Sequence, residues 1–391
     1  QRQMCIRDRG GAILCSQYVG SENTQEANRS AGQVLLVMAA LSTALSVICL
    51  VLRDPMLRLI FGKVDADVMA NSRTYFLFTL LSFPFIGLYD AGASIFRAQN
   101  NTRTPMVISV ISNLMNIAGN AVLIFGFDMG VAGAAISTLV SRIFCAIVVL
   151  WQLRSPLQPI SVRYYAKIRP DFSLIRRVLL IGVPSGIENS MFQFGKLAIQ
   201  STVSTLGTAA IAAQAMTNIL EALNGVAAMG VGIGLMTVVG QCIGANRKDE
   251  AVYYIKKLSW LAEIVIIVCC LFVLAITKPI TVIGGMEAES AKLCFQMVVF
   301  ITITKPISWV LSFIPAYGMR AAGDVKFSMI TSCLSMWLCR VSLCIFLCRA
   351  LGFGPIAVWI GMFADWSVRA VVFSWRFHSR KWLNHKVIEN K

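Results

Sequence analysis

The sequence predicts an all-α integral membrane protein built from two copies of one helical bundle, and three observations support this fold class. Of 391 residues, 57% are hydrophobic and only 14% are charged, whereas soluble domains are about 45–50% apolar and about 25% charged. Ten apolar runs have the length of about 20 residues that a helix needs to cross ~30 Å of hydrocarbon. Several motifs also recur at a nearly constant spacing, which indicates an internal duplication.

The apolar runs favour helices, because backbone polar groups in lipid must pair within the segment. Strands of a membrane barrel would be about ten residues long with alternating polarity, and these runs show neither property. The predicted spans are 33–52, 74–96, 105–126, 130–152, 178–204, 208–240, 258–277, 290–318, 326–348 and 353–375.

The charges between the spans predict the orientation of the chain. The connections on one side, together with the C-terminal tail, carry 20 lysines and arginines, and those on the other side carry 6. The positive-inside rule therefore places the first group, including the C-terminus, in the cytoplasm. The same rule explains the net charge of +16 without a nucleic-acid partner, and no nucleic-acid-binding module is visible.

Three pairs of segments carry the internal repeat. They are SQYVGSENTQEA (16–27) with GQCIGANRKDEA (240–251), FRAQNNTRTP (96–105) with MRAAGDVKFS (319–328), and GVAGAAIS (130–137) with GPIAVWIG (354–361). Because both copies of the first segment fall on the cytoplasmic side, the repeat is parallel, related by an axis along the membrane normal.

The second copy begins near residue 175, so its counterpart would lie before the start of the chain. We therefore expect a twelve-helix protein whose first lobe lacks about one and a half helices in this sequence. Because that lobe is incomplete, we expect the chain as given to transport poorly. Residues 1–9, QRQMCIRDR, would correspond to the apolar GVAAMGVGI of 225–233. Each charge at a helix centre costs ~2.5–3.5 kcal/mol on insertion scales, so we interpret 1–9 as extraneous.

The chain then divides into an incomplete N-terminal lobe, a linker, a C-terminal lobe and a basic cytoplasmic tail. These parts are 10–152, 153–177, 178–375 and 376–391. The linker carries three prolines and six basic residues, a composition that suits either an amphipathic segment on the inner membrane surface or a plain cytoplasmic loop.

The sequence offers no enzymatic chemistry and no cofactor site. It contains no C-x-x-C pair and no nucleotide-binding P-loop, and its two histidines, His378 and His385, lie in or beside the basic tail. A catalytic centre would need a cluster of nucleophilic, acidic or basic residues, and none is visible. We expect neither an enzyme nor a bound metal.

Four segments resemble the multidrug and toxic compound extrusion (MATE) family of transporters, over about residues 10–380. They are RAQNNTRTPM (97–106), NIAGNAVLIFGFDMGVAGAAIST (116–138), GVPSGIENSMF (182–192) and GQCIGANRKDEA (240–251). The resemblance implies two pseudo-twofold-related six-helix bundles. It further implies export of drugs or organic cations by Na⁺ or H⁺ antiport, with lobes that rock to give alternating access.

We accordingly expect a monomer in the plasma membrane, with membrane lipid and a small, cationic, amphipathic substrate as its partners. The alternative is a flippase for lipid-linked oligosaccharide or polysaccharide from the same superfamily. Such a protein usually carries an arginine-rich cleft, and intramembrane arginines are few in this sequence.

The first group of candidate ion- or substrate-binding residues is an amide stripe. Asn113, Asn116 and Asn120 fall within ~60° of one another on one helix face, and they should face the bundle interior because amides facing lipid are unfavourable. The resemblance adds Thr138 and matches Asn116 and Asn120 to an Asn and an Asp of the family. Amides supply oxygens but neither charge nor a titratable proton, so the alternative is that they hold helices together.

The second group consists of ionisable residues in or near the spans, which are functional candidates by default. The carboxylates are Asp90, Glu188, Glu221 and Asp365. The resemblance places the acidic residue of the second half near Phe192 and Gln193, so Glu188 is displaced by about a turn. Lys196 could pair with Glu221. The alternative for each carboxylate is a structural ion pair with Lys196, Arg142, Arg340 or Arg369, and the i, i+4 spacing favours it for Asp365 with Arg369.

Overall fold

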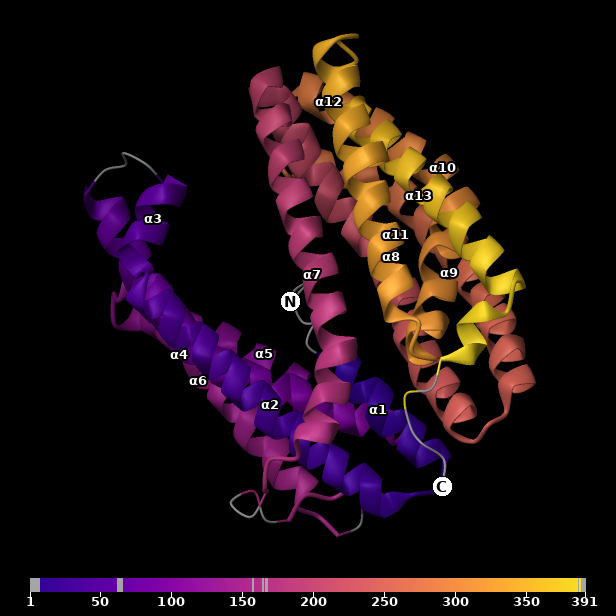
Figure 1. Cartoon of the computed structure of the whole chain (residues 1–391). Helices are drawn as coiled ribbons and strands as arrows, with labels where there is room; N and C mark the ends of the chain where they lie inside the picture. Colours follow the sequence, from indigo (N-terminus) through magenta and orange to yellow (C-terminus); the bar gives the residue numbers. More distant parts are fainter. Residues whose placement is uncertain are drawn as a thin grey trace. The chain divides into compact units, whose positions relative to one another are not determined.

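The computed structural model describes residues 8–61, 66–156, 158–163, 165, 168–385 and 387. These residues form helices and connecting turns, with no strand among them. The chain divides into two compact units, Gln1–Gly182 and Val183–Lys391, drawn in Figure 1 from indigo to yellow. Of the segment interpreted as extraneous, 1–7 lie outside the described residues, and the first helix begins at Asp8.

Helices follow one another through both units with short connections. The N-terminal unit contains α1 (Asp8–Gly20), α2 (Thr24–Val51), α3 (Arg53–Phe61), α4 (Ala66–Ala98), α5 (Arg103–Ala121), the π-helical segment η2 (Val122–Gly126) and α6 (Gly130–Leu153). The boundary between the units falls within α7 (Phe172–Val203). The C-terminal unit continues with η4 (Ser204–Leu206), α8 (Thr208–Gly244), α9 (Lys248–Ile283), α10 (Ala288–Ala321), α11 (Val325–Ser335), the π-helical segment η5 (Met336–Val341), α12 (Ser342–Arg349), α13 (Ile356–His378) and η6 (Lys381–Asn384).

The membrane-spanning prediction is confirmed for nine of the ten runs. Within the described part of the chain, nine helical stretches are long and apolar enough to cross a membrane. The tenth run, 178–204, is also helical and forms most of α7. This helix is more polar than the others because Glu188, Asn189, Gln193 and Lys196 interrupt its apolar sequence.

The turns of the two units repeat each other in backbone detail. Glu22 and Asn246, which are 224 residues apart, both have a left-handed backbone, with φ of 57° and 59°. Each lies between two helices and donates its N–H to the carbonyl three residues earlier, at 3.1 Å in both copies. A left-handed backbone is uncommon for residues other than glycine, so its recurrence at one repeat position supports the duplication.

The turn within the second repeat segment and the turn just before the third behave in the same way. Asn100 and Gly323 have φ of 62° and 102°, and Asp128 and Gly352 have φ of 54° and 65°. The residues of these two pairs are 223 and 224 apart, as are the first residues of the second and third pairs of segments. Glycine accepts positive φ without steric cost, whereas asparagine and aspartate tolerate it better than other residues, so different residue types maintain one turn.

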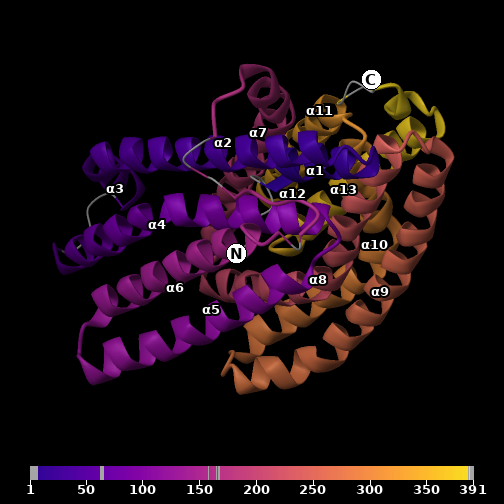
Figure 2. The same cartoon turned by 90° about the horizontal axis from the view of Figure 1, so that it is seen from below.

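Helix packing within each unit follows the same repeat. In the N-terminal unit, α4 packs against α1, α2 and α6, and α6 also packs against α5. In the C-terminal unit, α10 packs against α8, α9 and α13. Figures 1 and 2 both show these C-terminal helices running alongside one another. The central α4 and α10 therefore occupy equivalent places, and α10 buries a continuous row of polar and charged residues.

Between the end of α6 and Phe172, where α7 begins, the described residues of the linker are irregular and are fixed to the N-terminal unit; its last residues form the first turns of α7. Ile160 is fully buried, and its N–H donates to Gln99 Oε1 at 3.0 Å. The N–H of Ser161 donates to Asn28 Oδ1 at 2.8 Å. Tyr165 donates its hydroxyl to the Leu150 carbonyl at 2.6 Å, and burial raises the pKa of Tyr165 to about 12. The described residues between α6 and α7 are therefore held by side chains of α2 and of the turn that follows α4.

Candidate functional site

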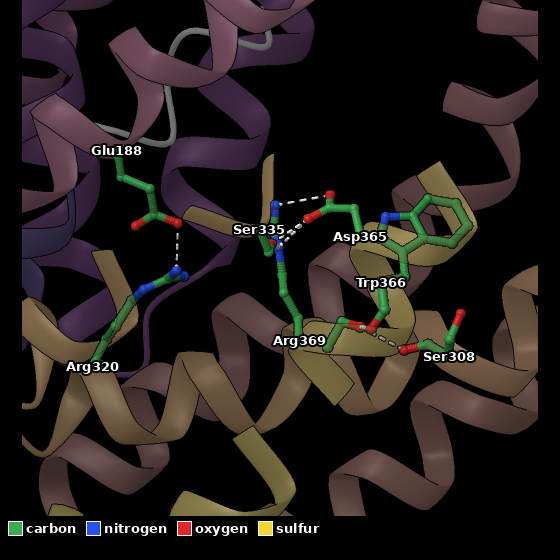
Figure 3. Close-up of polar contacts among 8 residues, drawn as sticks. Glu188, Ser308, Arg320, Ser335, Asp365, Trp366 and Arg369 are labelled. Atoms are coloured by element: carbon green, nitrogen blue, oxygen red, sulfur yellow. Dashed lines mark hydrogen bonds and ion pairs between the residues drawn. The ribbon is translucent and has the colours of Figure 1, made fainter. Parts of the chain in front are cut away.

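The C-terminal unit buries a polar cluster on α10, α11 and α13. Asp365 is fully buried and receives two hydrogen bonds from Arg369, from Nε at 2.9 Å and Nη2 at 3.0 Å. Ser335 on α11 donates its hydroxyl to Asp365 and accepts a bond from Arg369 Nε at 2.8 Å. Figure 3 shows the three side chains converging between the helices. The ion pair expected from the i, i+4 spacing is present, in the bidentate geometry that favours arginine.

Aromatic side chains complete the surroundings of Arg369. The guanidinium lies 4.7 Å from the ring centroid of Phe192 and 5.4 Å from that of Phe313. Phe192 and the half-buried Gln193 occupy the place where the family resemblance puts an acidic residue. An aromatic face attracts a guanidinium through its quadrupole, so Phe192 contributes an attraction here without a titratable group.

A second buried pair joins α8 to α10. Lys305 has no exposed side-chain surface, and its Nζ donates to Glu221 Oε1 at 2.9 Å and to Asn224 Oδ1. Glu221 retains 13% of its side-chain surface. The sequence prediction considered Lys196 as the partner of Glu221 and did not consider Lys305, although a lysine in the middle of a predicted span was a visible signal.

Space for the Lys305 ammonium depends on a glycine of α8. A Cβ added to Gly225 would lie 3.2 Å from Lys305 Nζ. Two indole rings also lie near the charge, with ring centroids 5.5 Å away for Trp309 and 6.0 Å away for Trp366. One carboxylate, one amide and two aromatic rings therefore surround the ammonium.

Glu188 forms the third buried pair, with a partner that the sequence prediction had placed elsewhere. Its Oε1 accepts a bond of 2.6 Å from Arg320 Nη2, and the side chains are 6% and 4% exposed. Figure 3 shows this pair beside the Asp365 group. Arg320 had been counted among the cytoplasmic connections, but the structure places it in the last turn of α10, buried. The other oxygen of Glu188 is buried without a hydrogen-bond partner among the described residues.

Two further ionisable residues of this unit differ from the three pairs. Lys196 on α7 is exposed. Glu263 lies within the predicted span 258–277, was not singled out from the sequence, and is only partly exposed. Its side chain forms no hydrogen bond or ion pair with any residue that the structure describes.

In the N-terminal unit, two of the three stripe amides meet Thr138. Asn116 Nδ2 donates to Thr138 Oγ1 at 3.2 Å, and Asn120 Nδ2 donates to Asn116 Oδ1 at 3.3 Å. The Oδ1 of Asn120 is buried and accepts no hydrogen bond from a described residue. This group therefore links α5 to α6 and leaves one amide oxygen available.

The third amide does not follow the prediction, because Asn113 is exposed rather than directed into the bundle. Its Nδ2 donates to the Ser109 carbonyl of its own helix at 2.9 Å. At this level of α5 the contact with α6 is made by Ser112, whose hydroxyl donates to the Ser141 carbonyl. Asn113 is one residue later, about 100° further round the helix, and so lies beside the contact face.

Asp90 is buried, with 2% of its surface exposed, and it acts electrostatically on Arg142 of α6. Arg142 Nη1 also donates to the Ser82 hydroxyl at 2.5 Å. Asp90 and Arg142 therefore form a polar group between α4 and α6, separate from the amides.

A pocket with a volume of about 410 Å³ lies among α3, α4 and α6 of the N-terminal unit. Its lining is mainly apolar, with polar atoms from Asn71, Ser72 and Tyr75. A volume of this size is in the range of small-molecule sites. None of the residues predicted from the sequence lines it.

Comparison with known proteins identifies sequence relatives over almost the full length of the chain. The model of the MatE family matches residues 8–122 and 184–346. The probable multidrug resistance protein YoeA of Bacillus subtilis is 27% identical over 367 residues, which cover 92% of this chain and 78% of YoeA. The probable multidrug resistance protein NorM of Thermotoga maritima is 23% identical over 395 residues, covering 97% of this chain and 82% of NorM.

Solved structures share the fold at lower sequence identity. An outward-facing multidrug resistance MATE family transporter superimposes with a TM-score of 0.88 at 17% identity, covering 97% of this chain and 85% of that one. A point mutant of the Vibrio cholerae MATE transporter VcmN gives a TM-score of 0.87 at 18% identity, covering 98% and 86%. At this identity, the similarity establishes the arrangement of the helices and nothing further.

Proposed function

Because the chain belongs to the MatE family of multidrug and toxic compound extrusion transporters, we propose that it exports small amphipathic organic cations by antiport with Na⁺ or H⁺. It is a multi-pass membrane protein and not an enzyme. The observation that carries the antiport proposal is the set of intramembrane carboxylates, since an ionisable group at this depth is a functional candidate by default.

Three of the intramembrane carboxylates of the C-terminal unit, Glu188, Glu221 and Asp365, are each bound to a basic side chain. A proton or Na⁺ that binds such a carboxylate competes with the ammonium or guanidinium for the same oxygens. Binding therefore changes which buried charges are paired, and a ligand drives a conformational change only when it binds one state more tightly than the other. If the basic side chain can move away from the carboxylate in only one conformation, the incoming cation binds that conformation more tightly. This difference in affinity would drive the rocking of the lobes.

Glu188 fits this role better than Asp365. One Glu188 oxygen binds Arg320 and the other accepts no hydrogen bond from a described residue. Both oxygens of Asp365 accept bonds from Arg369, and Ser335 adds a third donor. A cation arriving at Glu188 finds a free oxygen, whereas at Asp365 it must first break a bidentate pair.

The amide group of the N-terminal unit suits Na⁺ only. The free oxygen of Asn120, together with the oxygens of Asn116 and Thr138, can contribute to the coordination of a hard cation. None of the three side chains titrates in the physiological range, so they cannot carry a proton. Na⁺ coupling can therefore involve either unit, whereas H⁺ coupling falls to the carboxylates.

The flippase alternative requires arginines that reach a bulky pyrophosphate. Arg320, Arg340 and Arg369 are buried within the C-terminal unit, with 4%, 8% and 1% of their surfaces exposed. Side chains with so little accessible surface cannot surround a diphosphate, so the drug-export proposal is the better supported of the two.

The test is efflux of a fluorescent organic cation from proteoliposomes under an imposed Na⁺ or pH gradient. We expect Glu188→Gln to reduce gradient-driven efflux, because the amide cannot hold a proton or a net charge. Glu289→Gln, at an exposed position in the first turn of α10, is the matched control and should leave efflux unchanged. Unchanged efflux in Glu188→Gln would remove this residue from the mechanism. If the wild-type chain transported the dye equally fast with and without an imposed gradient, the antiport proposal would be wrong.

A further inference from the structure

Arg340 is a buried cation of the C-terminal unit that no described group neutralises. It lies in the π-helical segment η5 and is 8% exposed. Its Nε is buried without a hydrogen-bond partner. Its side chain donates no hydrogen bond to any residue that the structure describes and forms no ion pair with one.

The carboxylates that act on Arg340 are already occupied. Asp365 and Glu221 are the acidic side chains that influence it electrostatically. Asp365 binds Arg369 through both oxygens, and Glu221 binds Lys305. Each carboxylate therefore compensates another cation, and the Arg340 guanidinium remains as an additional positive charge.

An arginine cannot lose this charge by deprotonation, because its pKa is above the range in which proteins titrate. A charged side chain at the centre of a membrane helix costs about 2.5–3.5 kcal/mol on insertion scales. Buried charges are accordingly paired in folded proteins. Arg340 thus calls for an anion that is not one of the described side chains.

The depth of Arg340 argues against a lipid phosphate as this anion. It lies nine residues before Arg349, the end of α12, which corresponds to ~13 Å at 1.5 Å per residue. Since the hydrocarbon layer is ~30 Å thick, this position is near its middle. Asp365 lies nine residues after the first residue of α13, so the whole group has a similar depth.

The backbone that carries Arg340 is held by local contacts. The π-helical turn at η5 is closed by Ser342, whose N–H and hydroxyl both bind the Trp337 carbonyl. On the facing helix, a Cβ added to Gly361 would lie 2.8 Å from the Arg340 carbonyl oxygen. π-Helical segments of this kind frequently occur at functional sites.

We propose that Arg340 binds a small inorganic anion of the size of chloride inside the C-terminal unit. The low exposure of the side chain restricts the occupant to a small ion and excludes the carboxylate of a bulky substrate. Guanidinium N–H groups bind anions through charge-assisted hydrogen bonds. This binding is distinct from the proposed cation antiport, and it would neutralise the positive charge next to Asp365 and Glu221.

The experiment measures binding of radioactive chloride to the purified full chain in detergent, without substrate or ion gradient. We expect saturable binding of one chloride per chain, and an increase in Tm when chloride replaces gluconate at constant ionic strength. Arg340→Gln should weaken binding about tenfold or more, because a charge-assisted contact is lost. Arg349→Gln, at an exposed position on the neighbouring helix α12, controls for general salt effects and should bind as the wild type does.

A wild-type chain that binds no chloride above background overturns the proposal, and so does an Arg340→Gln chain that binds chloride with unchanged affinity. If Arg340→Gln does not fold, Arg340→Lys keeps the charge but loses the planar set of donors, and it should bind chloride more weakly than the wild type. Because no transport is measured, failure of gradient-driven efflux would leave this result unaffected.

Discussion

Replacement of Lys305 by methionine is the sharpest test of the buried charges. Methionine has a similar length, so the variant removes the ammonium and leaves little empty space. It also leaves the Glu221 carboxylate, with only 13% of its side chain exposed, without its cation. Breaking a buried ion pair from one side costs about 3–5 kcal/mol. Since Glu221 retains some exposure, we expect Lys305→Met to lower the free energy of unfolding by about 3 kcal/mol, the low end of that range.

The reverse change should be more damaging. Glu221→Gln leaves an ammonium with no exposed surface, held by Asn224 and two indole rings, and we expect a loss of about 4–5 kcal/mol. Replacing both residues together removes both charges, and such replacements are often neutral. The double variant should therefore be more stable than either single variant by roughly 2–4 kcal/mol, a non-additivity that only residues in contact produce.

Unfolding in mixed detergent micelles, followed by far-UV circular dichroism and tryptophan fluorescence, measures these differences. Trp309 and Trp366 lie close to the ammonium, so their emission reports on the same site. Lys292→Met, at an exposed position of the same helix, is the control and should stay within about 0.5 kcal/mol of the wild type. Equal losses in Lys305→Met and Lys292→Met, or strict additivity in the double variant, would refute the buried pair.

Two smaller effects follow from helix contacts. Gly361→Ala places a Cβ 2.8 Å from a backbone oxygen of the neighbouring helix, so unfolding in detergent should show a free energy of unfolding lower by about 1–3 kcal/mol. Gly230→Ala, whose Cβ would meet nothing within 4 Å, is the control and should show no loss of stability. Equal behaviour of the two variants would contradict the close approach at Gly361. Thr138→Val removes the acceptor of the Asn116 amide and should cost about 0.6 kcal/mol, a typical interhelical hydrogen bond in a membrane, in the same assay; a loss of several kcal/mol would mean that the group does more than join two helices.

The membrane spans could be predicted because their signal is local. A run of about 20 apolar residues identifies a span without knowledge of its neighbours. The signal for the repeated turns is also local, because glycine, asparagine and aspartate accept the left-handed backbone that Gly323, Asn100 and Asp128 adopt. The Asp365–Arg369 pair could be predicted for the same reason, because helix geometry alone brings residues four apart together.

The remaining contacts depend on how the helices are rotated against one another. The spacing of Asn113, Asn116 and Asn120 defines one face, but only the structure shows that the contact with α6 runs through Ser112 and Asn116. The partners of Glu188 and Glu221 lie 132 and 84 residues away in the chain. Helical periodicity relates residues only a few positions apart, so it cannot predict pairs with such a separation in the sequence. Arg320 is also buried, although it lies just after the end of a predicted span.

The duplication preserved the backbone while the electrostatics of the two units diverged. Asn116 lies on α5 of the N-terminal unit and Arg340 lies in η5, in the corresponding stretch of the C-terminal unit, so this part of the repeat carries a neutral amide in one unit and a permanent cation in the other. The amide is satisfied by Thr138, whereas the guanidinium has no described partner. A neutral site has no charged partner to release when Na⁺ binds, although the bound ion then brings its own charge into the membrane. Under the proposed antiport, a cation that reaches Glu188, Glu221 or Asp365 must instead displace the basic side chain that binds the carboxylate. The C-terminal unit is therefore where binding of an ion changes the pairing of buried charges most, and where substitutions should affect coupling and stability together.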